Sequence, residues 1–244
     1  MSPLFHFTHP VLVIGPAGIK PSLLTPLLRH YPVIAADGGA DVAQRLGVAP
    51  RLIIGDFDSI KDTNNHPQSR LVHLTDQDST DFEKVLQVVQ APLYLAFGFL
   101  GKRFDHSLAS LHAMANAKYP VLLVGKHDAL VFTQCQFTAS LPAGCRLSVH
   151  PLTSQAFANS QGLVWDLAGL TLTPYTNLGA KPGAKFGKAK LGTSNQVITD
   201  QANPLAKQTV TITPKSDATS GGGYFVIIPA HHWRCLLETI ELPD

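Results

Sequence analysis

The 244-residue chain has little cysteine and little excess charge. Its three cysteines are odd in number and form no C-x-x-C pair, which argues against a disulfide framework and against a zinc–thiolate site. The formal net charge of +2 gives no reason to expect a nucleic-acid or membrane partner. No apolar run approaches the roughly 18 residues of a membrane span, and Met1–Pro10 lacks the basic start of a secretory signal. We therefore expect a cytoplasmic protein.

Common nucleotide-binding and metal-binding motifs are absent as well. The chain has no G-x-x-x-x-G-K-[ST] loop, no G-x-G-x-x-G after the first apolar run, no kinase H-R-D set and no H-E-x-x-H. A nucleotide or metal site in this chain must therefore be built in another way.

The first half of the chain alternates short apolar runs with helical segments. The first run is Val11–Gly15 and the last is Val121–Val124. Strands that are apolar throughout and alternate with helices are typical of a parallel sheet covered on both faces. We expect residues 1–134 to form an α/β domain with a mostly parallel, doubly wound (Rossmann-like) sheet.

The pattern changes after about Gln134. Helical periodicity stops, and short alternating segments follow one another between clusters of Gly, Pro, Ser, Thr and Asn. We expect residues 135–244 to form an all-β sandwich domain. Its expected strands include Leu163–Leu167 and Cys235–Ile240, and the lysine-rich segment Pro174–Lys190 is expected to be a flexible loop.

Acidic residues are concentrated in the first half. More than half of the 17 acidic residues lie between Asp37 and Asp105, and nearly all of these are aspartates. Carboxylates gathered in one place repel one another unless a cation is present. The short Asp side chain suits Mg²⁺, which takes oxygen ligands and keeps several waters. Asp is also common in turns, so a single aspartate can have a purely structural role.

Four polar clusters each come directly after a predicted strand. In open α/β sheets, ligands bind outside the carboxyl ends of the strands, so we expect these clusters to converge at one edge of the sheet. The third cluster runs into a helix, because Thr80 and Glu83 have the spacing of a capping box. The clusters are Asp37-Gly38-Gly39-Ala40, Gly55-Asp56-Phe57-Asp58-Ser59, Asp76–Lys84 and Gly98–His106.

Together these clusters closely resemble the motifs of thiamine pyrophosphokinases, in the family's order and at compatible spacings. The resemblance covers about the first 130 residues well. It is looser afterwards, where Gly162–Leu167 and Ser194-Asn195 resemble two later motifs of the family. Pro174–Lys190, between those two, resembles an insertion.

The resemblance implies an enzyme that transfers the pyrophosphoryl group of ATP to the hydroxyl of thiamine, releases AMP and uses Mg²⁺. It also implies a homodimer whose subunits each have an α/β domain and a β-sandwich domain, with thiamine bound in a cleft between subunits. The implied metal ligands are Asp56, Asp58 and Asp81. Catalysis would involve these three together with Asp78 and Arg103. Asp78 or Asp81 could accept the proton of the thiamine hydroxyl, and the planar guanidinium of Arg103 suits a phosphate.

The remaining candidate residues fall into two groups. Nucleotide binding is expected from glycines that let the backbone approach a ligand and from nearby polar side chains. Thiamine binding is expected from an aromatic face and two polar side chains. Each also has a structural alternative, such as a tight turn, a helix cap or a core position. The nucleotide candidates are Asp37, Gly38, Gly39, Ser59, Thr80, Lys84, Gly98, Gly101, Lys102, Asp105 and His106; the thiamine candidates are Trp165, Ser194 and Asn195.

Three other functions remain open on the sequence. A pyrophosphokinase of another hydroxymethyl heterocycle, such as a pterin, would use a similar aspartate cluster. A Mg²⁺-dependent nucleotide phosphohydrolase would use water as the acceptor. A non-catalytic nucleotide or thiamine sensor would have little need of so many carboxylates.

Overall fold

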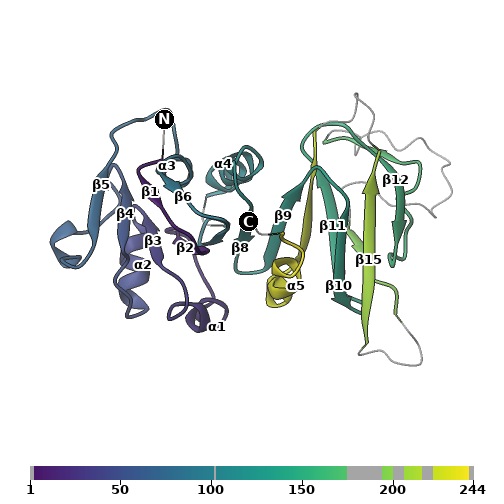
Figure 1. Cartoon of the computed structure of the whole chain (residues 1–244), viewed down its shortest axis with the longest axis horizontal. Helices are drawn as coiled ribbons and strands as arrows, with labels where there is room; N and C mark the ends of the chain where they lie inside the picture. Colours follow the sequence, from purple (N-terminus) through teal and green to yellow (C-terminus); the bar gives the residue numbers. More distant parts are fainter. Residues whose placement is uncertain (1–2, 102, 175–193, 200–205, 216–221, 242–244) are drawn as a thin grey trace. The chain divides into compact units, whose positions relative to one another are not determined.

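The computed structural model describes residues 3–101, 103–174, 194–199, 206–215 and 222–241. The chain divides into two compact units, one built from residues up to 127 and one from residues 128–241. Figure 1 shows their elements in chain order. Lys102 and nearly all of Pro174–Lys190 lie outside the described residues.

Parallel strands form the centre of the first unit, in the order β8-β7-β2-β3-β4-β5. All but the last are buried along their whole length, whereas β5 at the edge is mostly exposed. The continuous apolar runs therefore lie at the centre of the sheet, as their composition requires. The strands are β2 (Val11–Ile14), β3 (Val33–Ala36), β4 (Leu52–Gly55), β5 (Arg70–His73), β7 (Tyr94–Phe97) and β8 (Val121–Val124).

Helices and short turns connect these strands. A separate two-stranded parallel pair, β1 (Phe5–His6) and β6 (Val89–Gln90), completes the unit. None of the helices within the described residues is long and apolar enough to cross a membrane. The helices are α1 (Pro21–Leu24), η1 (Thr25–Leu27), α2 (Gly39–Arg45), η2 (Thr63–Asn65), α3 (Asp81–Val88) and α4 (Phe104–Ala115).

Helix α3 begins where the capping box predicts. The Thr80 hydroxyl accepts a hydrogen bond from the Glu83 N–H at 3.3 Å, and Glu83 Oε2 accepts one from the Thr80 N–H at 2.8 Å. A cap of this kind contributes about 1 kcal/mol. Phe82 is buried against the core. Asp81 and Lys84, three positions apart, then share a face of the helix.

The expected fold class was wrong. The parallel strands do not form a self-contained, Rossmann-like doubly wound sheet. They belong to a mixed sheet of ten strands, in the order β14-β11-β16-β9-β8-β7-β2-β3-β4-β5, in which the first four are antiparallel strands of the second unit. Hydrophobic patterning shows that a segment is a strand and how deeply it is buried. The pattern does not show which strands pair with the two edges of that segment. The loss of helical periodicity after about Gln134 therefore does not mark the end of the sheet.

The second unit contributes β9, β11, β14 and β16 to that sheet and has a separate four-stranded antiparallel sheet, β10-β15-β12-β13. Phe157 of β12 and Tyr224 of β16 are both buried and meet edge to face, with ring centroids 5.2 Å apart. This contact joins the two sheets of the unit in one apolar core. The elements are β9 (Asp128–Thr133), β10 (Phe137–Pro142), β11 (Arg146–Pro151), β12 (Gln155–Gln161), β13 (Thr171–Leu172), β14 (Ser194–Gln196), β15 (Lys207–Pro214), β16 (Tyr224–Pro229), η4 (Ala230–His232) and α5 (Trp233–Leu237).

Two strands expected in this unit are not formed. Cys235–Ile240 was expected to be a strand, but Cys235 lies in helix α5. Short apolar runs do not distinguish a strand from a turn or two of buried helix. Leu163–Leu167 contributes an isolated bridge between Leu163 and Val197 rather than a strand.

Candidate active site

Three aspartates meet at the carboxyl ends of two neighbouring strands. Asp37 follows β3, and Asp56 and Asp58 follow β4. One carboxylate oxygen from each lies within 4.8 Å of the other two. The parallel pairing of β3 and β4 produces this grouping, because it brings both strand ends to the same edge of the sheet.

Asp37 is the buried member of this acidic cluster, with 1% of its surface exposed. Its Oδ2 accepts a hydrogen bond from the Ser59 N–H at 3.0 Å. Its Oδ1 is buried and has no hydrogen-bond partner among the described residues. Burial, together with the nearby charge of Asp81, raises the pKa of Asp37 to about 6. A buried carboxylate oxygen without a donor is the feature that a bound cation would satisfy.

Asp56 and Asp58 lie on a tight turn held by hydrogen bonds from within the turn and from Gln77. The Asp58 N–H donates to Asp56 Oδ1 at 3.3 Å, and the Gln77 amide donates to Asp56 Oδ2 at 3.1 Å. Burial alone would raise the pKa of Asp56, but these hydrogen bonds and the ammonium of Lys84 lower it on balance. Asp58 is exposed and accepts a hydrogen bond from the Ser59 hydroxyl at 2.8 Å.

Lys84 brings a buried positive charge to the same place. It is 2% exposed, and its Nζ lies 3.2 Å from Asp81 Oδ1 and 3.6 Å from Asp56 Oδ2. Burial would lower the pKa of Lys84, but the two carboxylates raise it above its ordinary value. Burial raises the pKa of Asp81, and it outweighs the attraction of Lys84. Lys84 therefore joins Asp56 and Asp81 in one charged group.

Gly55 allows these side chains to approach one another. A Cβ atom at this position would lie 2.7 Å from the Cβ of Asp37 and 3.1 Å from Asp81 Oδ1. Asp37 and Asp81 thus pack over the same backbone atom from β3 and α3. A larger residue at position 55 would therefore force Asp37 to shift.

The other expected glycines occupy turns at the same edge. Gly38 precedes α2 and Gly39 begins it, where a Cβ atom would lie 2.0 Å from the carbonyl oxygen of Ile14. Gly98 and Gly101, after β7, have φ angles of 81° and 92°. Both adopt a left-handed backbone that other residues rarely take.

Arg103, Asp105 and His106 lie at the start of α4, outside the acidic cluster. The Arg103 guanidinium forms a two-pronged ion pair with Asp105, in which Nε lies 3.1 Å from Oδ1. Both side chains are 62% exposed. This ion pair leaves Arg103 accessible to a phosphate, which could replace Asp105 as its partner.

Asp78 and Thr80 lie on the loop that leads into α3. Asp78 is exposed, and its N–H donates to Asp76 Oδ1 at 3.1 Å. The Thr80 side chain is used in the helix cap. The structure thus gives Thr80 a clear structural role and leaves the Asp78 carboxylate facing solvent.

In the second unit, Asn195 holds the backbone of Trp165. Its Oδ1 accepts from the Trp165 N–H at 3.1 Å, and its Nδ2 donates to the Trp165 carbonyl at 2.6 Å. Asn195 is buried, whereas Trp165 is 38% exposed. Ser194 lies in β14 beside it. Asn195 therefore fixes the chain that presents the indole ring.

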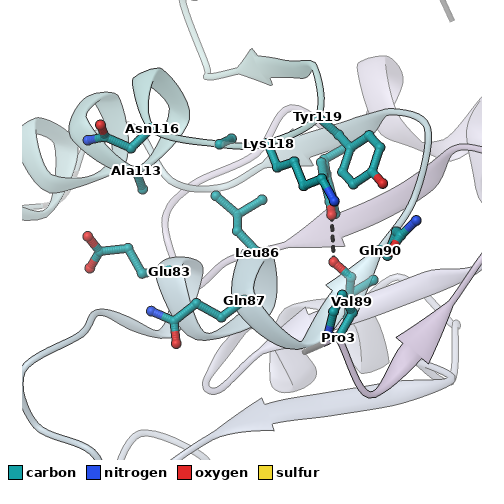
Figure 2. A pocket seen from close by; sticks show the side chains of 12 residues that line it. Pro3, Glu83, Leu86, Gln87, Val89, Gln90, Ala113, Asn116, Lys118 and Tyr119 are labelled. Carbon is teal, nitrogen blue, oxygen red and sulfur yellow. Dashed lines mark hydrogen bonds between the residues drawn. The ribbon is translucent and has the colours of Figure 1, made fainter. Parts of the chain in front are cut away.

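A cavity of about 360 Å³ lies elsewhere in the first unit, between α3 and α4. Figure 2 shows Leu86 at its centre, with Glu83 and Gln87 on one side and Asn116 and Lys118 on the other. None of the acidic-cluster residues lines it. Glu83 is already engaged in the cap of α3, so we do not place the chemistry in this cavity.

Two residues that support Asp56 were not among the candidates expected from the sequence. One is Gln77, whose amide reaches the carboxylate. The other is His73, whose Nε2 lies 3.1 Å from the Asp56 carbonyl oxygen. Gln77 lies inside an expected motif and could have been singled out. His73 belongs to no motif, and only the pairing of β5 with β4 places it there.

Comparisons with known proteins show what this chain is similar to. Residues 27–123 match the family model described as the catalytic domain of thiamin pyrophosphokinase. Over 189 residues the chain is 27% identical to Thiamin pyrophosphokinase 1 of Caenorhabditis elegans, which covers 69% of this chain and 72% of that protein. The resemblance expected from the motifs is therefore confirmed.

Solved structures share the fold. A thiamin pyrophosphokinase from Geobacillus thermodenitrificans superposes with a TM-score of 0.68 at 20% identity, covering 90% of this chain and 97% of that one. The enzyme from Candida albicans gives a TM-score of 0.69 at 15% identity, covering 94% of each chain. The yeast enzyme gives 0.66 at 14% identity, with coverages of 98% and 95%. At these identities the likeness concerns the fold alone.

Proposed function

We infer that this chain belongs to the thiamin pyrophosphokinase family and is an ATP:thiamine diphosphotransferase. It transfers the pyrophosphoryl group of ATP to the hydroxyl of thiamine, giving thiamine diphosphate and AMP. The observation that carries this inference is the cluster of Asp37, Asp56 and Asp58 at the carboxyl edge of the sheet. It lies within the segment that matches the family's catalytic domain.

We propose that the acidic cluster holds Mg²⁺. Asp56 and Asp58 belong both to the ligand set implied by the motifs and to the geometric cluster. Asp81 is a ligand implied by the motifs but lies outside the geometric cluster, whereas Asp37 lies in the cluster but is not an implied ligand. Because both pack against Gly55, we propose that all four aspartates surround the ion. The buried, unpartnered Oδ1 of Asp37 supports this fit. Bound there, the ion would offset the negative charge that develops on the transferred phosphoryl group.

The side chains around the cluster bind ATP and orient the reacting groups. Arg103 grips a phosphate in a bidentate manner, because its exposed guanidinium can exchange Asp105 for the ligand. Lys84 keeps Asp56 and Asp81 in place. The glycine turns before α2 and after β7 let backbone N–H groups approach the nucleotide. Asp78 and Asp81 are the two candidate acceptors of the thiamine hydroxyl proton.

Thiamine recognition falls to the second unit in this proposal. The exposed indole of Trp165 offers a flat face for a cationic heterocycle, and Asn195 holds the Trp165 backbone. We propose that the protein is a homodimer acting in the cytoplasm, with residues 1–134 supplying nucleotide and Mg²⁺ binding and residues 135–244 supplying thiamine binding.

The experiment measures products from the purified chain with ATP, Mg²⁺ and thiamine. We expect thiamine diphosphate and AMP in equal amounts, and a loss of at least about 100-fold in kcat for Asp56→Asn, since electrostatic groups of this kind contribute several kcal/mol. Asp62→Asn is the matched control, because Asp62 caps η2 and asparagine caps equally well. Phosphate release without an acceptor would identify a phosphohydrolase instead. Turnover of a hydroxymethylpterin but not thiamine would identify a different pyrophosphokinase.

A further inference from the structure

We propose that His73 is a positioning residue that holds the turn carrying Asp56 and Asp58 in its ligand-binding shape. The proposal rests on the proposed function only in taking these carboxylates as magnesium ligands. His73 lies outside the motifs that resemble the family and is the last residue of edge strand β5.

The turn between Asp56 and Asp58 is strained. Phe57, between them, has a φ angle of 66° and is a non-glycine residue in the left-handed region. This conformation costs roughly 1–2 kcal/mol for an ordinary L-residue and is rare for a bulky one. The other non-glycine residue with positive φ among the described residues is Asp37, in the same site. Strain of this kind persists only when surrounding contacts hold it in place.

Two sets of contacts hold Phe57. On one side it packs against a buried apolar cluster that includes Ile53 and Ile60. On the other side the imidazole ring of His73 stacks on the phenyl ring, with centroids 5.1 Å apart and an angle of 18° between the planes. Phe57 is therefore enclosed between the core and His73.

His73 also holds the backbone of the same turn. Its Nε2 lies 3.1 Å from the carbonyl oxygen of Asp56. Because a carbonyl oxygen only accepts, the hydrogen bond requires the proton on Nε2. The pairing of Gly55 with His73 in the β4–β5 ladder places the imidazole beside the turn. One side chain thus contacts two consecutive residues of the turn, which a merely solvated histidine would not do.

Without His73, the turn should relax toward ordinary backbone angles, and Asp56 and Asp58 should no longer point to the same place. The expected result is weaker Mg²⁺ binding with unchanged thiamine affinity. Because His73 is an exposed residue on an edge strand, its removal should leave the rest of the fold intact.

The test measures Mg²⁺ binding by titration calorimetry in the presence of a non-hydrolysable ATP analogue, together with the melting temperature. For His73→Ala we expect the dissociation constant for Mg²⁺ to rise about tenfold and the KM for thiamine to stay the same. Leu71→Ala is the matched control, because Leu71 lies two positions away on the same face of β5 and is 41% exposed. It should bind Mg²⁺ as the parent does. His73→Phe, which keeps the ring but lacks the N–H, should fall between the parent and His73→Ala.

Two outcomes would overturn the proposal. One is a Mg²⁺ dissociation constant in His73→Ala within twofold of the parent value. The other is an equal loss of Mg²⁺ binding in Leu71→Ala, which would indicate general damage to the edge strand. Calorimetry requires no turnover, so a parent protein that binds Mg²⁺ but makes no thiamine diphosphate would refute the proposed function and still test His73. A parent that binds no Mg²⁺ would refute both.

Discussion

Replacing Lys84 with methionine tests how the charges at the site balance one another. The substitution keeps the volume of the side chain and removes the buried ammonium, which lies 3.2 Å from Asp81 and 3.6 Å from Asp56. At an effective dielectric constant of about 20, each of these attractions is worth roughly 5 kcal/mol before desolvation is counted. Burying the ammonium offsets much of that gain.

The net effect of Lys84→Met on stability depends on the two carboxylates that lose their partner. Removing one partner of a buried ion pair costs about 3–5 kcal/mol. The Asp81 side chain is 32% exposed and can regain water or a proton, so we expect a smaller loss of about 2–3 kcal/mol in the free energy of unfolding at pH 7. The loss should shrink below about pH 4, because protonated carboxyl groups no longer need the ammonium.

Urea unfolding measures the loss of stability in EDTA and its recovery in excess Mg²⁺. Mg²⁺ should recover most of the stability lost in Lys84→Met, because a divalent cation among the same carboxylates replaces the missing charge. Lys61→Met, an exposed lysine on the nearby loop, should change the free energy of unfolding by less than about 0.5 kcal/mol. An unfolding free energy for Lys84→Met equal to that of the parent in EDTA would refute the reasoning.

Two further substitutions test the geometry of the acidic cluster. Asp37→Asn should remove activity yet raise the free energy of unfolding at pH 7.5, by up to about 3 kcal/mol, because the folded pKa of about 6 lies above the ordinary value of 3.8 for an aspartate. This gain in unfolding free energy should fall as the pH drops from 6 to 4 and vanish below pH 4. Chemical unfolding at several pH values measures it, and a gain independent of pH would contradict the prediction. Gly55→Ala should cost about 1–3 kcal/mol, since the added Cβ overlaps Asp37. Thermal melts would measure that cost, and an unchanged melting temperature with normal Mg²⁺ binding would count against it.

Local signals were sufficient for much of the first unit. The apolar runs at Val11–Ile14 and Val121–Val124 form buried strands, as expected of short apolar runs that alternate with helices in a parallel sheet covered on both faces. Thr80 and Glu83 cap α3 because the capping interaction involves residues three positions apart. The clustering of Asp37 with Asp56 and Asp58 follows from the rule that parallel strands end at one edge.

Strand pairing required the tertiary structure. Nothing in the alternation of Asp128–Thr133 indicates that β9 belongs to the same ten-stranded sheet as the parallel strands, and this is where the Rossmann-like expectation failed. The segment that begins at Cys235, within helix α5, was expected to be a strand for a related reason. A short apolar run has the same sequence pattern in a buried helix and in a buried strand.

The sequence by itself indicated which carboxylates, glycine turns and caps follow the strands of the first unit, since these features depend on residue type and short spacings. Only the tertiary structure decided how they are supported. His73 reaches Asp56 from the neighbouring strand, and Lys84 reaches Asp56 from a helix more than 20 positions later in the chain. Such contacts depend on strand register and helix packing, which arise from the whole core and leave no local pattern in the sequence.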